Sequence, residues 1–119
     1  RYTSLTMQTR ILPCSEIKSA ALCLKRGNPV VFPTETVYGL GAPIGDPDAI
    51  AQVFHIKGRP SDNPLIAHVD SIEQVSTICQ NIPPSFFLLA ERFWPGPLAI
   101  VLDKRSYVPG IASAGLSTL

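Results

Sequence analysis

The 119-residue chain is poor in several features that would each identify a class of protein. Only 16% of its residues are charged, and ten Lys and Arg against nine Asp and Glu leave a net charge of +1. This balance excludes the global basic field that dominates nonspecific nucleic-acid binding, so local groups must hold any bound anion. The longest apolar runs, residues 86–90 among them, span five residues, far fewer than the roughly 20 residues of a membrane span.

Cysteine is also scarce. Cys14, Cys23 and Cys79 are odd in number, lie far apart and form no C-x-x-C pair. This spacing argues against a disulfide framework and a structural zinc site, and we expect three small apolar residues in a reducing compartment. No charged segment followed by an apolar one opens the chain as a secretion signal. The cytoplasm is therefore the expected location.

The sequence lacks the glycine motifs that bind phosphates. A G-x-x-x-x-G-K-[ST] pattern is absent, which excludes a P-loop, and the single G-x-G at residues 39–41 lacks the third glycine of a dinucleotide fingerprint. The two histidines, His55 and His68, have no histidine or cysteine close by in sequence. We therefore expect neither a transition-metal site nor a Cys–His hydrolase.

What the chain does contain is an alternation of helical and strand patterns. Its 45% hydrophobic content suits one globular domain. Helices are expected over 15–26, 46–57, from 71, and over 84–94, and strands over 30–32, 64–69 and 98–102. This order predicts an α/β layered fold, with strand order and direction left open. Residues 1–6 read as an extension, and residues 7–119 as a domain that is incomplete at its C-terminal end.

Capping residues mark several of these helices. N-caps are expected at Ser15, Asp46 and Ser71, and helix ends at Gly27 and Gly58. The first helix should bury the face that carries Ile17, Ala20, Ala21 and Leu24. The second should bury the face that carries Ile50, Val53 and Phe54 and ends at Lys57.

Basic and polar residues gather between the second helix and the strand that follows it. Lys57 and Arg59 flank a glycine and can meet phosphate oxygens from two directions, one as a point charge and the other as a planar fork. Asn63 offers both a donor and an acceptor to a base, a ribose or a phosphate. Two alternatives stay open: Lys57 as a helix C-terminal cation, and residues 61–64 as an ordinary Asx turn.

A second polar group leaves the end of the first strand, where α/β sheets usually bind ligands. The hydroxyls of Thr34 and Thr36 can hydrogen-bond a small polar substrate, although strand propensity alone also explains threonine there. His68, on the next expected strand, is more often a core residue than a catalyst. Together these segments predict a site for a phosphorylated ligand and a small polar co-substrate.

Four motifs, PTETVYGLG, KGRPSDNPL, IAHV and FWPGPL, resemble those of the YrdC-like family of L-threonylcarbamoyladenylate synthases. The resemblance runs from about residue 7 to residue 119. It implies a twisted mixed sheet with flanking helices. It also implies a nucleotidyltransferase that joins L-threonine, bicarbonate and ATP into threonylcarbamoyl-AMP and releases pyrophosphate. Mg²⁺ would be bound through the phosphates, and tRNA and the threonylcarbamoyl-transferase complex would be further partners.

By motif position, the resemblance places Thr36 and His68 against L-threonine. It assigns Lys57, Arg59, Asn63 and Thr118 to ATP, with no protein nucleophile and no metal ligand. Two departures stand out: the family continues beyond this chain with a strand that carries an arginine, and Ala99 stands where relatives often have a hydroxyl. These departures predict weaker binding, incomplete folding or loss of activity in a chain of this length.

Two other functions are weighed against the synthase. One is an RNA-binding module without catalysis, which the balanced charge disfavours. The other is a carbamoyl-transfer domain of a hydrogenase-maturation protein, for which the chain lacks the flanking zinc-finger and acylphosphatase-like segments.

Overall fold

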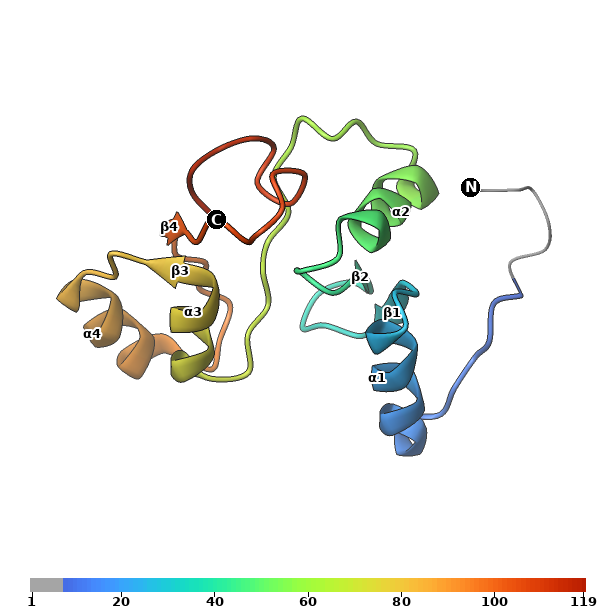
Figure 1. Ribbon diagram of the computed structural model, residues 1–119. Helices are drawn as coiled ribbons and strands as arrows, with labels where there is room; N and C mark the ends of the chain where they lie inside the picture. The colour runs from blue at the N-terminus through green and yellow to red at the C-terminus, as the bar shows by residue number, and fades with distance from the viewer. Residues whose placement is uncertain (1–7) are drawn as a thin grey trace.

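The computed structural model describes residues 8–119, so the extension expected over residues 1–6 lies outside the described residues. The elements lie in two groups within an envelope of 48 × 34 × 23 Å (Figure 1). The first group contains α1 (Ile17–Lys25), β1 (Val30–Phe32), β2 (Gly39–Gly41) and α2 (Pro47–Lys57). The second contains α3 (Ile72–Ile78), β3 (Cys79–Gln80), α4 (Pro84–Phe93) and β4 (Asp103–Lys104). Residues 58–71 connect the two groups.

Helix α2 begins and ends where the sequence predicts. The Asp46 carboxylate accepts a hydrogen bond from the Ala49 backbone N–H at 3.0 Å, and Pro47 is the first helical residue. Gly58 ends the helix in the left-handed conformation, at φ 60°. Ile50, Val53 and Phe54 of the expected face are buried, whereas Lys57, which was predicted to end that face, is exposed. This helix therefore presents residues 57–63 at a well-defined position.

Asp46→Ala should lower the free energy of unfolding by about 1 kcal/mol, because the first-turn N–H of Ala49 would lose its acceptor. Asp46→Asn keeps a side-chain oxygen and should stay within a few tenths of a kcal/mol of the original chain. Urea denaturation of both variants measures the difference. Equal losses in the two variants would mean that the carboxylate charge, rather than the cap, is what stabilises the helix.

The start of α1 differs from the prediction. Ser15 does not cap the helix, because residues 14–16 form a 3₁₀ turn, η1 (Cys14–Glu16), closed by the Glu16 N–H and the Pro13 carbonyl at 2.9 Å. The helix begins two residues later than its expected cap and ends at Lys25, and Gly27 follows with φ 82°. None of its residues is fully buried, and Ile17 is 73% exposed. The predicted buried face of this helix is therefore wrong.

Strand β1 is confirmed, but its partner was expected to be loop. β2 pairs antiparallel with β1, so that Phe32 lies opposite Gly39. A Cβ atom at Gly41 would lie 2.8 Å from Phe32 Cε1, and one at Gly39 would lie 3.1 Å from the same ring. The two glycines of the G-x-G pattern therefore make room for an aromatic ring.

The strands expected over 64–69 and 98–102 are wrong as assignments. Both segments lack the backbone ladder of a strand within residues 8–119; pairing instead occurs in two small antiparallel sheets, β1–β2 and β3–β4. Residues 64–69 make one backbone bond outside their own segment, from the Leu65 N–H to the Ala112 carbonyl at 2.9 Å. Leu102 exchanges two bonds with Leu119, at 3.0 and 2.8 Å. Apolar alternation predicted the burial of these segments, but it does not identify the neighbouring strands with which they would form backbone hydrogen bonds.

The two groups of elements share one hydrophobic core. Ile50 and Phe54 of α2 belong to the same cluster as Val75 of α3 and Phe86 of α4. Ser71 caps α3 as predicted, since its hydroxyl accepts the Gln74 N–H at 3.3 Å. The α/β class is confirmed. None of the helices in the described residues has the length and apolar character that a membrane crossing requires.

Candidate functional site

A cavity of about 780 Å³, here called the large cavity, lies along the connecting segment and the second group of elements. Its walls include residues 64–72, 94–102, 116, 118 and 119, together with Glu35 from the loop between β1 and β2. Side chains of α3 and α4, including Val75 and Phe86, contribute apolar surface to its wall. A mainly apolar cavity with a few polar groups is the usual form of a small-molecule site.

One wall of the large cavity is the extended segment 64–69. Leu65, Ala67 and Val69 are half-buried and pack against the core, whereas Ile66 and His68 are exposed. This alternation follows from extended backbone, in which successive side chains point to opposite sides. His68 therefore stands on the side of the segment away from the core.

His68 and Thr118 both line the large cavity, although 50 positions separate them in sequence. The His68 ring meets the ring of Phe32 edge to face, with centroids 5.8 Å apart. Thr118 forms an antiparallel bridge with Asp103, and the neighbouring Leu119 is bonded to Leu102. Both predicted site residues are thus positioned by contacts with other segments of the chain.

Residues of the FWPGPL motif, from Trp94 to Leu98, also line the large cavity. The Trp94 Nε1–H donates to the Leu98 carbonyl at 2.9 Å, and this bond closes the turn through residues 95–97. The Trp94 ring packs edge to face on Phe86, with centroids 5.6 Å apart. We did not assign this motif to the site from sequence; its Trp-Pro-Gly-Pro turn was the available signal.

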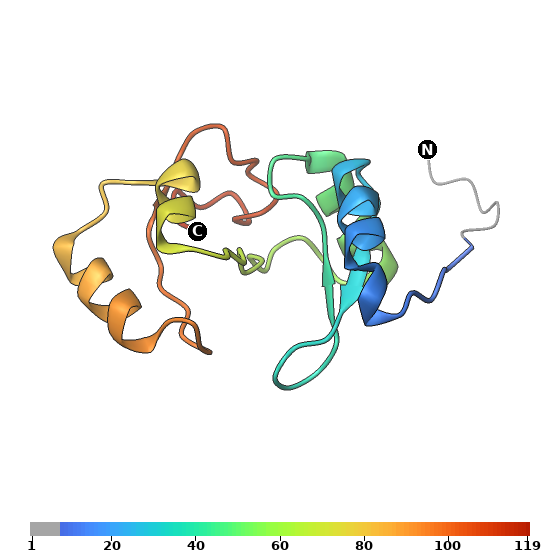
Figure 2. The same ribbon diagram turned by 90° about the horizontal axis from the view of Figure 1, so that it is seen from below.

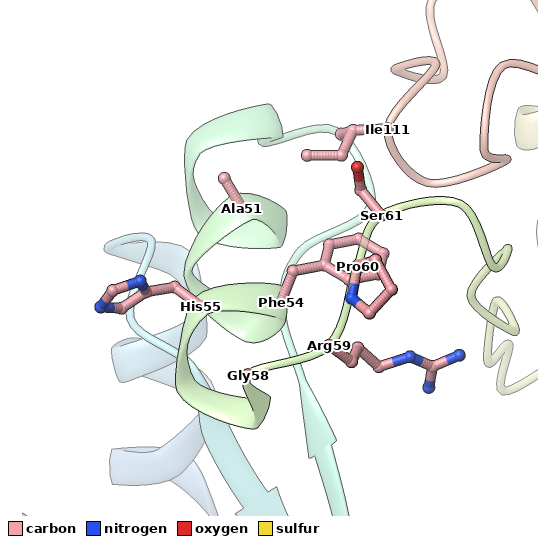
Figure 3. Close-up of a pocket in the computed structure, with 8 residues that line it drawn as sticks. All are labelled: Ala51, Phe54, His55, Gly58, Arg59, Pro60, Ser61 and Ile111. Atoms are coloured by element: carbon pink, nitrogen blue, oxygen red, sulfur yellow. The ribbon is translucent and has the colours of Figure 1, made fainter.

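A second, smaller pocket of about 620 Å³ lies beside the C-terminal half of α2 (Figure 3). Its lining comprises Ala51, Phe54, His55, Gly58, Arg59, Pro60, Ser61 and Ile111. The Arg59 backbone N–H donates to the Phe54 carbonyl at 3.2 Å, and its guanidinium extends away from α2. The lining also includes the Ser61 hydroxyl and the His55 imidazole, while the Arg59 guanidinium points away from the other labelled side chains (Figure 3). A guanidinium and a hydroxyl are groups that suit an anion.

Three of the predicted site residues line neither of these two cavities. Lys57 is exposed in the last turn of α2, and Asn63 is exposed in the connecting segment. Thr36 is exposed in the loop between β1 and β2, which projects from the hairpin in Figure 2. The structure thus brings His68 and Thr118 to one cavity and Arg59 to the other. It groups Thr118 with the residue assigned to threonine rather than with those assigned to ATP.

Thr34 gives the loop between β1 and β2 its shape. Its hydroxyl donates to the Val37 carbonyl and accepts the Thr36 N–H at 3.3 Å. Both bonds are local side-chain-to-backbone contacts of the kind that stabilise turns. The hydroxyl of Thr34 therefore has a structural role, and that of Thr36 stays available to a ligand.

Cys79 lies in the wall of the large cavity and is only 4% exposed. Burial raises the pKa of its thiol above the ordinary 9.0, and the positive charge of Arg105 offsets part of that rise. When the pKa of a group is higher in the folded chain than in the unfolded chain, the folded chain holds the proton more tightly. The resulting contribution to stability is fully present below the unfolded pKa and is lost as the pH rises. The unfolding free energy should therefore fall as pH rises above 9.0. Denaturant titrations against pH should show a smaller fall for Cys79→Ala, and equal falls would contradict the prediction.

Comparison with known proteins identifies the family. Residues 23–119 match the Sua5/YciO/YrdC family, described as "Telomere recombination". The chain belongs to this family. The resemblance drawn from its four motifs is thereby confirmed.

Relatives of the chain within the Sua5/YciO/YrdC family include named synthases. It is 49% identical over 104 residues to the threonylcarbamoyl-AMP synthase of Pyrococcus abyssi, covering 87% of this chain and 31% of that protein. It is 43% identical over 105 residues to the threonylcarbamoyl-AMP synthase of Bacillus subtilis, covering 87% of this chain and 30% of that protein. The chain thus spans less than a third of the length of either relative.

Solved structures of Sua5 and YciO share the fold. The crystal structure of P. abyssi Sua5 complexed with L-threonine superposes with a TM-score of 0.86 at 46% identity, covering 92% of this chain and 32% of that one. E. coli YciO gives a TM-score of 0.73 at 23% identity, covering 88% of this chain and 51% of that one. The second likeness concerns the fold alone.

Proposed function

We propose that this chain provides the L-threonine- and ATP-binding part of a threonylcarbamoyl-AMP synthase. The observation that carries the proposal is its likeness, at 46% identity over 92% of its length, to a Sua5 structure complexed with L-threonine. The two cavities support it, because one is mainly apolar with a few polar groups and the other has an arginine.

The proposed reaction has two steps. The unprotonated amine of threonine attacks carbon dioxide and releases a proton, or attacks bicarbonate and releases water, and either reaction forms a carbamate. A carbamate oxygen then attacks the α-phosphorus of ATP. Pyrophosphate leaves as the bond between the α-phosphorus and the bridging oxygen breaks. Neither step needs a protein nucleophile, so the protein acts by positioning its substrates and stabilising charge.

Thr36 and His68 are proposed to contact threonine. His68 stands in the wall of the large cavity, while Thr36 belongs to the loop that also supplies Glu35 to that wall. A hydroxyl and an imidazole can both donate to the carboxylate of an amino acid and accept from its polar groups. Their role is to hold the substrate so that its amine faces the incoming carbon.

Lys57, Arg59, Asn63 and Thr118 are proposed to contact ATP. Arg59 can bind phosphate oxygens through two parallel N–H donors, and Lys57, two residues away in sequence, adds a second positive charge. Both charges would stabilise the pyrophosphate leaving group. Among residues 8–119, no three His, Cys, Asp or Glu side chains gather as metal ligands. The residues present fit a Mg²⁺ ion bound through ATP phosphates and water, which supplies further charge neutralisation when bound.

The test is a reaction with labelled L-threonine, bicarbonate, ATP and Mg²⁺. We expect threonylcarbamoyl-AMP and pyrophosphate to form in equal amounts, and both to be absent when bicarbonate is removed. The protein should be assayed both as this chain and in its natural length, together with calorimetric titration of threonine and ATP. Absence of product in both forms, with no binding of threonine or ATP, would contradict the proposal. Transfer of the threonylcarbamoyl group to tRNA by partner proteins is the proposed use of the product.

A further inference from the structure

The loop between β1 and β2 contributes one residue, Glu35, to the wall of the large cavity. This residue lies inside the turn that the hydroxyl of Thr34 stabilises through its two bonds to residues 36 and 37. The turn is attached to β1, whose last residue, Phe32, contacts the His68 ring across the same region. Glu35 and His68 thus line one cavity from two separate segments, and the contact between Phe32 and His68 connects those segments.

The two cavities have opposite charge. The charged side chains that line the large cavity are Glu35 and Asp70, and its lining includes neither lysine nor arginine. The smaller pocket has Arg59 and no acidic residue in its lining. A cavity whose charged lining is acidic favours a cationic group and disfavours phosphate, and its apolar walls strengthen that preference.

Of the two carboxylates, Glu35 is better placed for a ligand. Asp70 belongs to the turn that leads into α3, where its backbone N–H donates to Gln74 Oε1 at 2.9 Å. Glu35 comes from the loop between β1 and β2 and makes no ion pair with any residue of the described range 8–119. An amino acid bound between Glu35 and His68 would have its ammonium group near the first and its carboxylate near the second.

We propose that Glu35 binds the α-ammonium group of the amino-acid substrate and so selects for ligands with a free amine. This inference rests on the proposed function, since it names the group that recognises one end of the threonine molecule. Glu35 is an exposed residue of the cavity wall, and an ion pair with it holds the amine in place before it reacts. The role given to Glu35 is one of binding and positioning.

Calorimetric titration with two ligands tests the proposal. The ligands are L-threonine and 3-hydroxybutyrate, which has the same carboxylate and hydroxyl but no amine. Glu35→Gln should weaken threonine binding about tenfold or more, because a charge-assisted hydrogen bond is lost. It should leave 3-hydroxybutyrate binding unchanged. Asp70→Asn, the matched control in the same cavity, should bind threonine within about twofold of the original chain. Glu35→Asp should recover part of the loss.

The outcomes separate this inference from the proposed function. If the unaltered chain binds ATP and threonine but Glu35→Gln binds threonine equally well, the Glu35 role is overturned and the proposed function stands. Equal weakening of both ligands would indicate a structural effect and would also overturn the inference. A loss confined to Asp70→Asn would assign the ammonium site to the other carboxylate. If the unaltered chain binds no threonine, the proposed function fails for this chain and the inference fails with it.

Discussion

The Phe86→Ala variant is expected to lose about 3–5 kcal/mol of unfolding free energy, the usual cost of removing a buried phenylalanine ring. Phe86 is 1% exposed and belongs to the core cluster shared by the two groups of elements. Its ring meets those of Phe87 and Trp94 with centroids 5.2 and 5.6 Å away. A loss of this size is a large fraction of the roughly 5–15 kcal/mol that stabilises a typical domain.

Trp94 is the single tryptophan of the chain and contacts Phe86, so its fluorescence can follow unfolding in urea. Phe87→Ala is the matched control, because Phe87 is the next residue on the same helix but is 43% exposed. It should lose about 1–2 kcal/mol, since much of its ring stays in water in the folded chain. Comparable losses in both variants would mean that α4 does not pack on the core through Phe86. Because Phe86 also lines the large cavity, its replacement should weaken threonine binding as well.

The second large effect concerns nucleotide binding. Arg59→Ala should weaken ATP binding about tenfold to a hundredfold, because it removes a charged donor pair from the smaller pocket. Arg59→Lys keeps the charge but loses the planar fork, and should recover only part of the affinity. Calorimetric titration with ATP and Mg²⁺ measures both. Lys57→Ala should also weaken ATP binding, with little change in melting temperature.

Two controls distinguish ligand binding from helix capping. Lys25 occupies the last turn of α1, as Lys57 does in α2, so Lys25→Ala removes a cation from a comparable helix end. It should leave ATP affinity unchanged. If Lys57→Ala lowers the melting temperature and leaves ATP affinity intact, Lys57 serves the helix end rather than the nucleotide. Unaltered ATP binding by Arg59→Ala would remove the smaller pocket from the proposed site.

Short-range signals were sufficient for much of the fold. Asp46, Pro47 and Gly58 delimit α2 because a cap, a proline and a left-handed glycine act within one helical turn. Ser71 and Gln74 do the same for α3, although the Gln74 side chain bonds the N–H of Asp70 rather than that of Ser71. Ser15 does not cap α1 because it lies within the 3₁₀ turn that precedes the helix. Several competing turns of similar energy are possible at a helix start, and local sequence alone does not rank them.

The pairing of segments that lie far apart in the sequence could be predicted much less well. Residues 64–69 show the apolar alternation of a strand. That pattern predicts which side of the segment is buried, but it does not predict which other segment forms backbone hydrogen bonds with it. β2 was missed because Gly-Leu-Gly has low strand propensity, and only the ring of Phe32 explains why glycines are needed there. In both cases the deciding contact comes from a residue elsewhere in the chain.

Taken alone, the sequence determined the α/β class, the limits of α2, the family and the residues that could meet a phosphate or a small polar substrate. These features depend on side-chain chemistry and on contacts within one turn of the backbone. Tertiary structure alone decided that His68 and Thr118 share a cavity with Glu35 while Arg59 lines another. Such groupings depend on how distant segments pack around a common core, because packing rather than sequence spacing sets the distance between side chains from different segments.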